Sequence, residues 1–233
     1  ILDRGVNDKI KLHGDSLLVN SLLRLNRGDF FCINYEGTFT ESSNQKNKKY
    51  RFKAPEKYAT LLKNGGITHV SIANNHSYDF NTTGFNATVK ALETNDLKVM
   101  GNTASPTILS KGDYKCAILS ASFTSSSKAL PLSNLNALLK VVEEFEAKQN
   151  KIPLIIYIHW GLELQQKPEQ WQKEAARSLI KAGADAIVGH HPHVIQSMEF
   201  VRNCPVFYSL GNFVADAYLG STNEGYLVEF EIT

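Results

Sequence analysis

The sequence has few cysteines and no long apolar run. Its 233 residues include three cysteines, Cys32, Cys116 and Cys204, and none of them belongs to a C-x-x-C pair. Separated cysteines in odd number argue against a disulfide framework and against a zinc site built from thiolates, so we expect buried cysteines in or beside strands. The longest apolar run, residues 154–158, is far too short to span a bilayer.

The sequence also lacks an excess of charge of one sign. It has 25 basic and 23 acidic residues and a formal net charge of +2, so no overall field attracts nucleic acid or an acidic surface. The length suits a single domain over residues 1–233 with a sizeable core. Because the first residue is Ile1 rather than Met, we expect a processed chain or a fragment, with any signal or anchor upstream of it.

Several common catalytic signatures are missing. There is no G-x-S-x-G elbow of a serine hydrolase, and there is no G-x-x-x-x-G-K-[ST] or G-x-G-x-x-G loop that cradles phosphates. The sequence around the cysteines contains no evident feature that would stabilise a thiolate. These absences disfavour serine and cysteine hydrolases and the common nucleotide-binding loops.

Apolar runs alternate with helical patterns along most of the chain, which predicts a layered α/β domain. Helices are expected at residues 16–26, 54–63, 82–94, 133–149 and 168–182. Ser133 is the expected N-cap of the fourth and Gly183 the expected C-cap of the fifth. Strands are expected at residues 29–33, 67–73, 114–121, 152–158, 185–188, 206–209 and 226–232. The lysine-rich residues 41–53 and the serine-rich residues 122–133 are predicted to be solvated loops, and Gly211-Asn212 a strand-end turn.

Side chains that can bind a metal or transfer a proton follow four of the expected strands. They are, strand by strand, Asn34 and Glu36, then Asn74, Asn75 and His76, then His159, then His190, His191 and His193. Ligand sites in α/β sheets collect beyond the carboxyl ends of the strands, so four such coincidences favour a common site. Single members keep other interpretations: a capping or packed residue for His159, a turn for Asn74-Asn75, and a solvated carboxylate for Glu36.

The segment Gly189-His190-His191-Pro192-His193 is the strongest single signal. Three imidazoles within four residues repel one another when protonated, and Pro192 stiffens the turn, so a metal site explains the cluster better than packing does. Imidazole and carboxylate ligands suit zinc, manganese or iron. His13 and His69 have no such context, and we assign His13 to solvent and His69 to ordinary packing.

Five motifs occur in an order that resembles a known family. They are Ile33-Asn34-Tyr35-Glu36-Gly37, Ala73-Asn74-Asn75-His76 with Asp79, His159-Trp160-Gly161 with Glu163, Gly189-His190-His191-Pro192-His193-Val194, and Tyr208-Ser209-Leu210-Gly211-Asn212-Phe213. Through these motifs the chain resembles, over nearly its whole length, the CapA family of capsule and poly-γ-glutamate biosynthesis proteins. That family is a branch of the calcineurin-like metallophosphoesterase superfamily.

The resemblance implies a four-layer αββα sandwich, metallophosphoesterase-like, of two mixed sheets with helices outside. It also implies one or two divalent ions (manganese, zinc or iron), as in superfamily relatives. Glu36 takes the position of a bridging carboxylate and Asn75 that of a metal ligand. The histidines implied as further ligands are His159 and His191 for one ion and His193 for the other.

His76 is implied as the proton donor to a leaving group. Asp79 and Glu163 are candidates to orient imidazoles, and solvated loop carboxylates are the alternative for both. Arg4 is a candidate to hold an anionic substrate, with a plain surface arginine as the alternative.

The family's opening strand ends in a Gly-Asp pair whose aspartate is a metal ligand. Gly14-Asp15 looks like this pair, but residues 9–13 are too polar for a central strand. Residues 2–6 resemble the family segment that follows the pair, so we expect the true aspartate, and the first strand, upstream of Ile1.

Two functions are consistent with the resemblance. The first is a metal-dependent hydrolase-like protein of capsule or poly-γ-glutamate biosynthesis that acts on a phosphoester or a γ-glutamyl amide. The second is a non-catalytic, polymer-binding component of a poly-γ-glutamate synthesis and export complex. Both imply an anionic partner, a membrane synthase or export complex, no nucleic acid, and a place on the extracytoplasmic face of the cell envelope.

Overall fold

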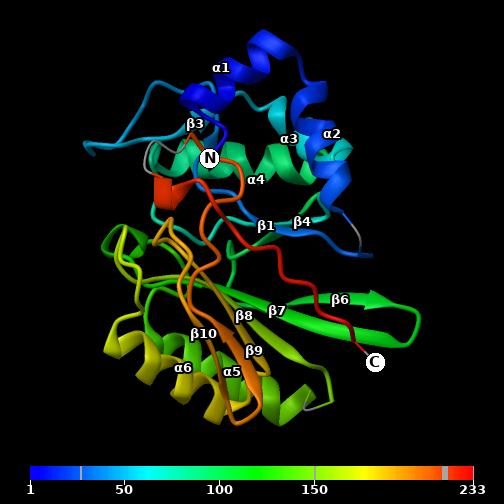
Figure 1. The fold of residues 1–233 in the computed structure, drawn as a ribbon, viewed down its shortest axis with the longest axis vertical. Coiled ribbons are helices and arrows are strands. Elements are labelled where there is room, and N and C mark those ends of the chain that lie inside the picture. The colour runs from blue at the N-terminus through cyan, green and yellow to red at the C-terminus, as the bar shows by residue number, and fades with distance from the viewer. Residues whose placement is uncertain (27, 150, 217–219, 233) are drawn as a thin grey trace. The chain divides into compact units, whose positions relative to one another are not determined.

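The computed structural model describes residues 1–26, 28–149, 151–216 and 220–232 (Figure 1). The chain divides into two compact units, of which the first consists of residues 1–102 and 214–216 and the second of residues 103–213 and 217–233. Each unit combines parallel strands with helices, and none of the sheets closes into a barrel in the described part of the chain. The predicted α/β fold class is thereby confirmed, and the single-domain assignment stays a prediction.

The first unit contains a short parallel sheet. This sheet has the order β1-β4-β5, and β2 and β3 form a separate parallel pair. The elements of the unit are α1 (Arg4–His13), α2 (Ser16–Leu25), β1 (Cys32–Asn34), β2 (Thr38–Phe39), β3 (Lys53–Ala54), α3 (Tyr58–Asn64), β4 (His69–Ser71), α4 (Asn81–Thr94) and β5 (Lys98–Met100).

Helix α1 is an element that the sequence pattern did not predict. Asp3 caps it, because its Oδ1 accepts a hydrogen bond from the Arg4 N–H at 2.7 Å. Gly14 ends it with φ at +83°, a left-handed value that glycine adopts without strain. Since Gly14 and Asp15 lie between two helices, the interpretation that they are not the strand-end Gly-Asp motif is confirmed.

The second unit is built on a larger mixed sheet with the order β10-β11-β9-β8-β7-β6. Strands β7, β8, β9 and β11 run parallel, and the edge strands β6 and β10 pair antiparallel to their neighbours. The elements are β6 (Thr107–Lys111), β7 (Tyr114–Ser122), η1 (Ser125–Ser127), α5 (Leu135–Gln149), β8 (Leu154–His159), α6 (Gln170–Ala182), β9 (Ala186–His190), β10 (Met198–Val201), β11 (Cys204–Phe207) and η2 (Gly220–Thr222).

Helices α5 and α6 lie on one face of the larger sheet, where they form a common apolar core with the strands (Figure 1). Strand β8 is buried along its whole length, as an all-apolar run predicts for a central parallel strand. Helix α6 begins with a capping box of Glu169 and Gln172, and it ends at Gly183 with φ at +120°, which confirms the predicted C-cap.

Three local predictions were wrong. The N-cap of α5 is Asn134, whose Oδ1 accepts from the Ala137 N–H at 3.0 Å, and not Ser133. Helix α3 begins four residues after the predicted start, since Ala54 instead belongs to β3 and pairs with Phe39.

The third wrong prediction is the strand at residues 226–232. The described residues there form no strand. Gly225, just before them, makes an isolated antiparallel bridge with Gly211, and no strand pairing continues from it into the described residues 226–232. Tyr226 and Leu227 are exposed, and none of the described residues 226–232 is buried, so the apolar alternation of this segment creates no buried face.

The cysteines lie in strands, as predicted. Cys32 is in β1, Cys116 in β7 and Cys204 in β11. Cys116 is buried and the other two are partly buried. Burial, helped by the charge of Asp185, raises the pKa of Cys116 to about 11, so this thiol stays protonated at neutral pH. None of the helices in the described part of the chain has both the length and the apolar composition that a membrane span requires.

His69 makes the stability of the first unit depend on pH. It lies buried in β4, and burial, with the nearby charge of Lys98, lowers its pKa to about 4. An unfolded histidine has a pKa of about 6.5, so the unfolded state binds more protons between these values. The stability from neutral His69 is therefore present above pH ~6.5 and is lost as the pH falls through the folded value.

We expect the free energy of unfolding to fall by roughly 3 kcal/mol from neutral pH to about pH 4 because of His69. Urea titrations at several pH values measure it. The His69→Gln variant should lose this part of the pH dependence, while His13→Gln, at an exposed histidine, should keep it. Equal pH dependence in both variants would contradict the prediction.

Candidate functional site

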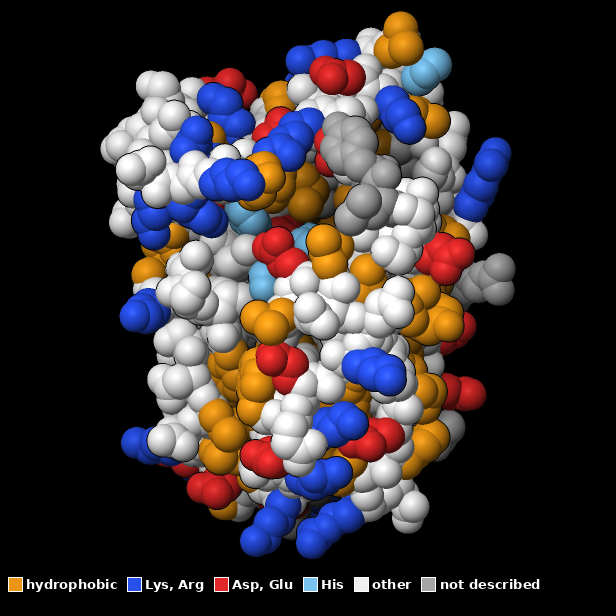
Figure 2. All heavy atoms as spheres, turned by 60° about the vertical axis from the view of Figure 1, so that its left-hand side comes forward, with side chains coloured by type: hydrophobic (Ala, Val, Ile, Leu, Met, Phe, Trp, Pro, Cys, Tyr) orange, Lys and Arg blue, Asp and Glu red, His pale blue; other side chains and the backbone are white. Residues whose placement is uncertain are grey.

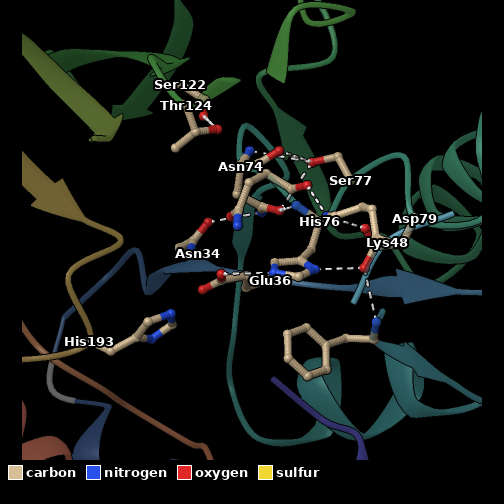
Figure 3. A network of polar contacts seen from close by, with 12 residues as sticks. Asn34, Glu36, Lys48, Asn74, His76, Ser77, Asp79, Ser122, Thr124 and His193 are labelled. Carbon is tan, nitrogen blue, oxygen red and sulfur yellow. Dashed lines mark hydrogen bonds and ion pairs between the residues drawn. The ribbon is translucent and has the colours of Figure 1, made fainter. Parts of the chain in front are cut away.

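Asn74 ties the carboxyl ends of β1 and β4 together. Its side-chain amide donates to the backbone oxygen of Tyr35 at 2.8 Å and to Asn34 Oδ1 at 3.2 Å. Its Oδ1 accepts from the His76 N–H at 3.0 Å. Asn74 is buried, and these bonds satisfy its amide. Asn74 therefore does more than turn the chain, because it fixes the backbone that carries His76 (Figure 3).

His76 is held in one orientation by Asp79. Its Nδ1 lies 2.6 Å from Asp79 Oδ2, and both residues are buried. A carboxylate can only accept hydrogen bonds, so Nδ1 carries the hydrogen and Nε2 is the nitrogen left for proton exchange. Nε2 points toward Glu36, whose Oε1 lies 3.8 Å away (Figure 3). The Phe52 ring packs on the imidazole, with the two ring centroids 4.4 Å apart.

The buried carboxylate of Asp79 collects several hydrogen bonds. Lys48 Nζ donates to Oδ1 at 2.6 Å, and the Phe52 N–H donates to Oδ2 at 2.9 Å. Burial would raise the pKa of Asp79, but the hydrogen bonds from His76, Lys48 and Phe52 hold that pKa below its ordinary value. Asp79 is therefore ionised at neutral pH. Lys48 Nζ also donates to the backbone oxygen of Asn75 at 2.9 Å. Lys48 therefore links Asn75 to Asp79, the residues on either side of His76 in this motif.

His159 and His190 end neighbouring strands of the second unit and lie opposite each other in the β8–β9 ladder. Gly189, one residue earlier, is required by close packing. A Cβ at this position would lie 2.1 Å from the backbone oxygen of Tyr208 and 2.6 Å from Trp160 Nε1. These two atoms are joined by a hydrogen bond of 3.0 Å. A larger residue at position 189 would thus displace the turn that follows β9.

The turn after β9 has a strained backbone. His191 has φ at +103° and His193 at +59°, in the region that residues with a Cβ seldom adopt. Such a conformation costs on the order of 1–3 kcal/mol per residue and persists where the surrounding structure enforces it, often at functional sites. Here the Leu164 N–H holds the turn by donating to the backbone oxygen of Pro192 at 2.8 Å.

The imidazoles of the second unit lie close together. The ring centroids of His159 and His191 are 4.7 Å apart, and those of His191 and His193 are 6.2 Å apart. His193 Nδ1 lies 2.9 Å from Asn212 Oδ1, an atom that only accepts, so Nδ1 carries the hydrogen and Nε2 has the lone pair. Glu163, His191 and His193 each offer one ligand atom, and these atoms lie within 4.8 Å of one another. Nitrogen and oxygen donors at this spacing fit zinc, manganese or iron.

The site residues predicted from the sequence fall into two groups, one in each unit. Those of the first unit are Glu36, Asn75, His76 and Asp79. Those of the second unit are His159, His191 and His193. Within each unit the members lie close together, and their metal-binding and catalytic roles stay predictions. His190 packs its ring against Tyr157, with centroids 4.3 Å apart, and His13 is exposed as predicted.

The structure adds residues that the sequence reasoning missed. Lys48 comes from a segment predicted to be a solvated loop, and Asn212 from a predicted turn, yet both contact site residues directly. For Asn212 a signal existed, since it belongs to one of the ordered motifs. For Lys48 the charge pattern gave none, because nothing in it distinguishes this lysine from its neighbours.

Comparison with known proteins agrees with the motifs. A family model described as "Bacterial capsule synthesis protein PGA_cap" matches residues 1–217. The chain is similar to "Capsule biosynthesis protein CapA" of Bacillus anthracis, with 29% identity over 252 residues that cover 100% of this chain and 60% of that protein. It is also similar to "PGA biosynthesis protein CapA" of Bacillus subtilis (strain 168), with 30% identity over 219 residues, 88% of this chain and 58% of that protein.

The chain thus spans less than two thirds of the length of these curated relatives. The family model covers nearly all of the chain and includes the strand-end motifs up to Asn212. On this match, together with the α/β fold, the chain belongs to the bacterial capsule synthesis protein family PGA_cap.

Proposed function

We propose that this chain acts in capsule or poly-γ-glutamate biosynthesis as a metal-dependent hydrolase of a phosphoester or a γ-glutamyl amide. The observation that carries the proposal is the buried His76–Asp79 pair. An imidazole held through Nδ1 by a carboxylate presents Nε2 in a fixed direction, which is the arrangement that general acid catalysis needs.

In the proposed reaction, protonated His76 gives its Nε2 proton to the leaving oxygen or nitrogen of the substrate. Asp79 keeps the ring in place and stabilises its charged form, since its oxygen accepts from Nδ1 at 2.6 Å. Lys48 in turn partners the other oxygen of Asp79. Phe52 covers one side of the imidazole and limits its contact with water.

A divalent ion is part of the proposal. Glu163, His191 and His193 fit such an ion by their donor types and spacing, and Asn212 orients the His193 ring as outer partners of metal ligands do. When bound, the ion would lower the pKa of a water molecule and polarise the bond to be cleaved. Metal-ligand roles for Glu36, Asn75 and His159 rest on the family resemblance.

The place of the protein in the cell is also a proposal. The names of the two relatives refer to capsule and PGA biosynthesis, so we place this chain at the extracytoplasmic face of the cell envelope. Its partners there would be an anionic polymer or phosphoester and a membrane synthase or export complex.

Metal binding has a graded prediction. Loss of a residue that hydrogen-bonds to a metal ligand lowers the metal affinity by about 10–100-fold. We therefore expect Asn212→Ala to weaken zinc or manganese binding by that factor. His193→Ala should weaken it further, and His13→Ala should leave it unchanged. Isothermal titration of metal-free protein measures the affinities. Equal affinities in all four proteins would exclude His193 as a ligand.

Hydrolysis has a separate prediction. His76→Gln should lower turnover of a generic phosphodiester or of poly-γ-glutamate by about a hundredfold to ten-thousandfold, because the proton donor is lost. Steady-state assays with manganese or zinc measure turnover, and thermal unfolding verifies that the variant is folded. If the metal-loaded wild type cleaves neither substrate, the hydrolase proposal fails and a polymer-binding role is favoured.

A further inference from the structure

We propose that residues 46–53, together with Arg4, form a docking surface for a linear polycarboxylate that leads to His76. We call residues 46–53 the basic segment. The inference rests on the proposed function, because it supplies the polymer on which that function acts.

The basic segment carries a high density of positive charge. Five of its eight residues 46–53 are cations, namely Lys46, Lys48, Lys49, Arg51 and Lys53, and none is acidic. Within the described part of the chain, Lys48 is the only one of these whose charged side-chain group lies within 4.0 Å of a carboxylate, that of Asp79. The Asp3 carboxylate lies nearby, where it accepts from the Lys53 backbone N–H at 2.9 Å. The protein as a whole has a net charge of only +2, so this charge is a local feature. Figure 2 shows a face of the molecule on which Lys and Arg side chains gather.

The basic segment is held in place by Asp79. The Lys46 N–H donates to the Asp79 backbone oxygen at 2.8 Å, and the Phe52 N–H and Lys48 Nζ bind its carboxylate. Arg51 Nη1 closes the turn by donating to the backbone oxygens of Lys46 and Lys48. A solvated loop would have no such fixed contacts, whereas this segment is bonded to Asp79 near both ends, at Lys46 and Phe52, and in the middle, at Lys48. The remaining cations are therefore presented in a defined arrangement.

Aromatic rings support the cations of this surface. The Arg4 guanidinium lies 4.7 Å from the centroid of the Phe52 ring and 5.3 Å from that of Tyr50. Lys49 Nζ lies 5.0 Å from the Tyr50 centroid, and Lys53 Nζ lies 5.3 Å from that of Phe80. Such contacts hold each charged group over a ring, and because Arg4, Lys49 and Lys53 are exposed, the other side of each charged group can still contact a ligand.

The surface suits anionic groups spread along a chain, which the poly-γ-glutamate of the proposed function supplies as carboxylates. Four of the five cations are lysines, which act as separate point charges along the segment, whereas tight recognition of one compact anion favours the forked donors of arginine. Phe52 belongs to the segment and packs on His76. A polymer bound along the segment would consequently reach the proposed proton donor.

The test is binding of fluorescently labelled poly-γ-glutamate, followed by anisotropy at low and high salt. Lys49→Glu/Lys53→Glu changes two exposed lysines of the segment. Lys11→Glu/Lys90→Glu is the matched control, because it makes the same charge change at exposed positions of the same unit. We expect about tenfold weaker binding in the first variant at low salt, no loss in the control, and little difference between them at high salt.

Several outcomes would overturn the inference. Equal losses of poly-γ-glutamate affinity in the two variants would indicate a general charge effect. Unchanged affinity in both variants, or no binding by the wild type, would also contradict the inference. Polyphosphate that binds as tightly as poly-γ-glutamate, with the same loss in the segment variant, would overturn the carboxylate assignment.

Metal titration separates this inference from the proposed function. Lys49→Glu/Lys53→Glu should bind zinc as the wild type does, since neither lysine is among the candidate ligands. His193→Ala should bind the polymer normally while losing the metal. Loss of both properties in either variant, with the fold retained, would contradict the separate roles.

Discussion

One buried carboxylate governs the arrangement of the first unit. Asp79 is fully buried and ionised, and burial of an ion is costly unless hydrogen bonds replace the lost water. His76, Lys48 and the Phe52 N–H provide those bonds. The same charge therefore orients the imidazole and anchors the basic segment, so that the proposed proton donor and the proposed polymer surface depend on one electrostatic constraint.

The second unit places its histidines by a different means. Gly189 lets the backbone of Tyr208 and the ring of Trp160 approach where no side chain would fit. The turn that follows holds His191 and His193 at positive φ, a conformation that the packed sheet must maintain. Here backbone geometry, rather than a buried charge, determines where the donor atoms lie. A rigid sheet with short strand-end turns suits this purpose, because strained loops need a stable scaffold.

Elements with a long regular pattern were predicted well, and those that depend on distant partners were not. Helix α4 and strand β7 match residues 82–94 and 114–121 to within a residue, since periodic apolar side chains define a buried face locally. Residues 226–232 have strand-like alternation, but in the described part of the chain they form no strand. Ala54, the predicted first residue of a helix, belongs instead to strand β3. It pairs with Phe39, a distant partner that local propensity does not reveal.

By itself the sequence determined the donor types, their order at the strand ends, and the family, because side-chain chemistry and strand-end position follow from local pattern. Only the tertiary structure decided which partner each polar group has. Lys48 and Asp79 are 31 residues apart in the chain, and His193 and Asn212 are 19 apart. Those pairings follow from the path of the folded chain. The Asn212 contact determines the tautomer of His193, and Lys48 anchors the Asp79 carboxylate that determines the tautomer of His76.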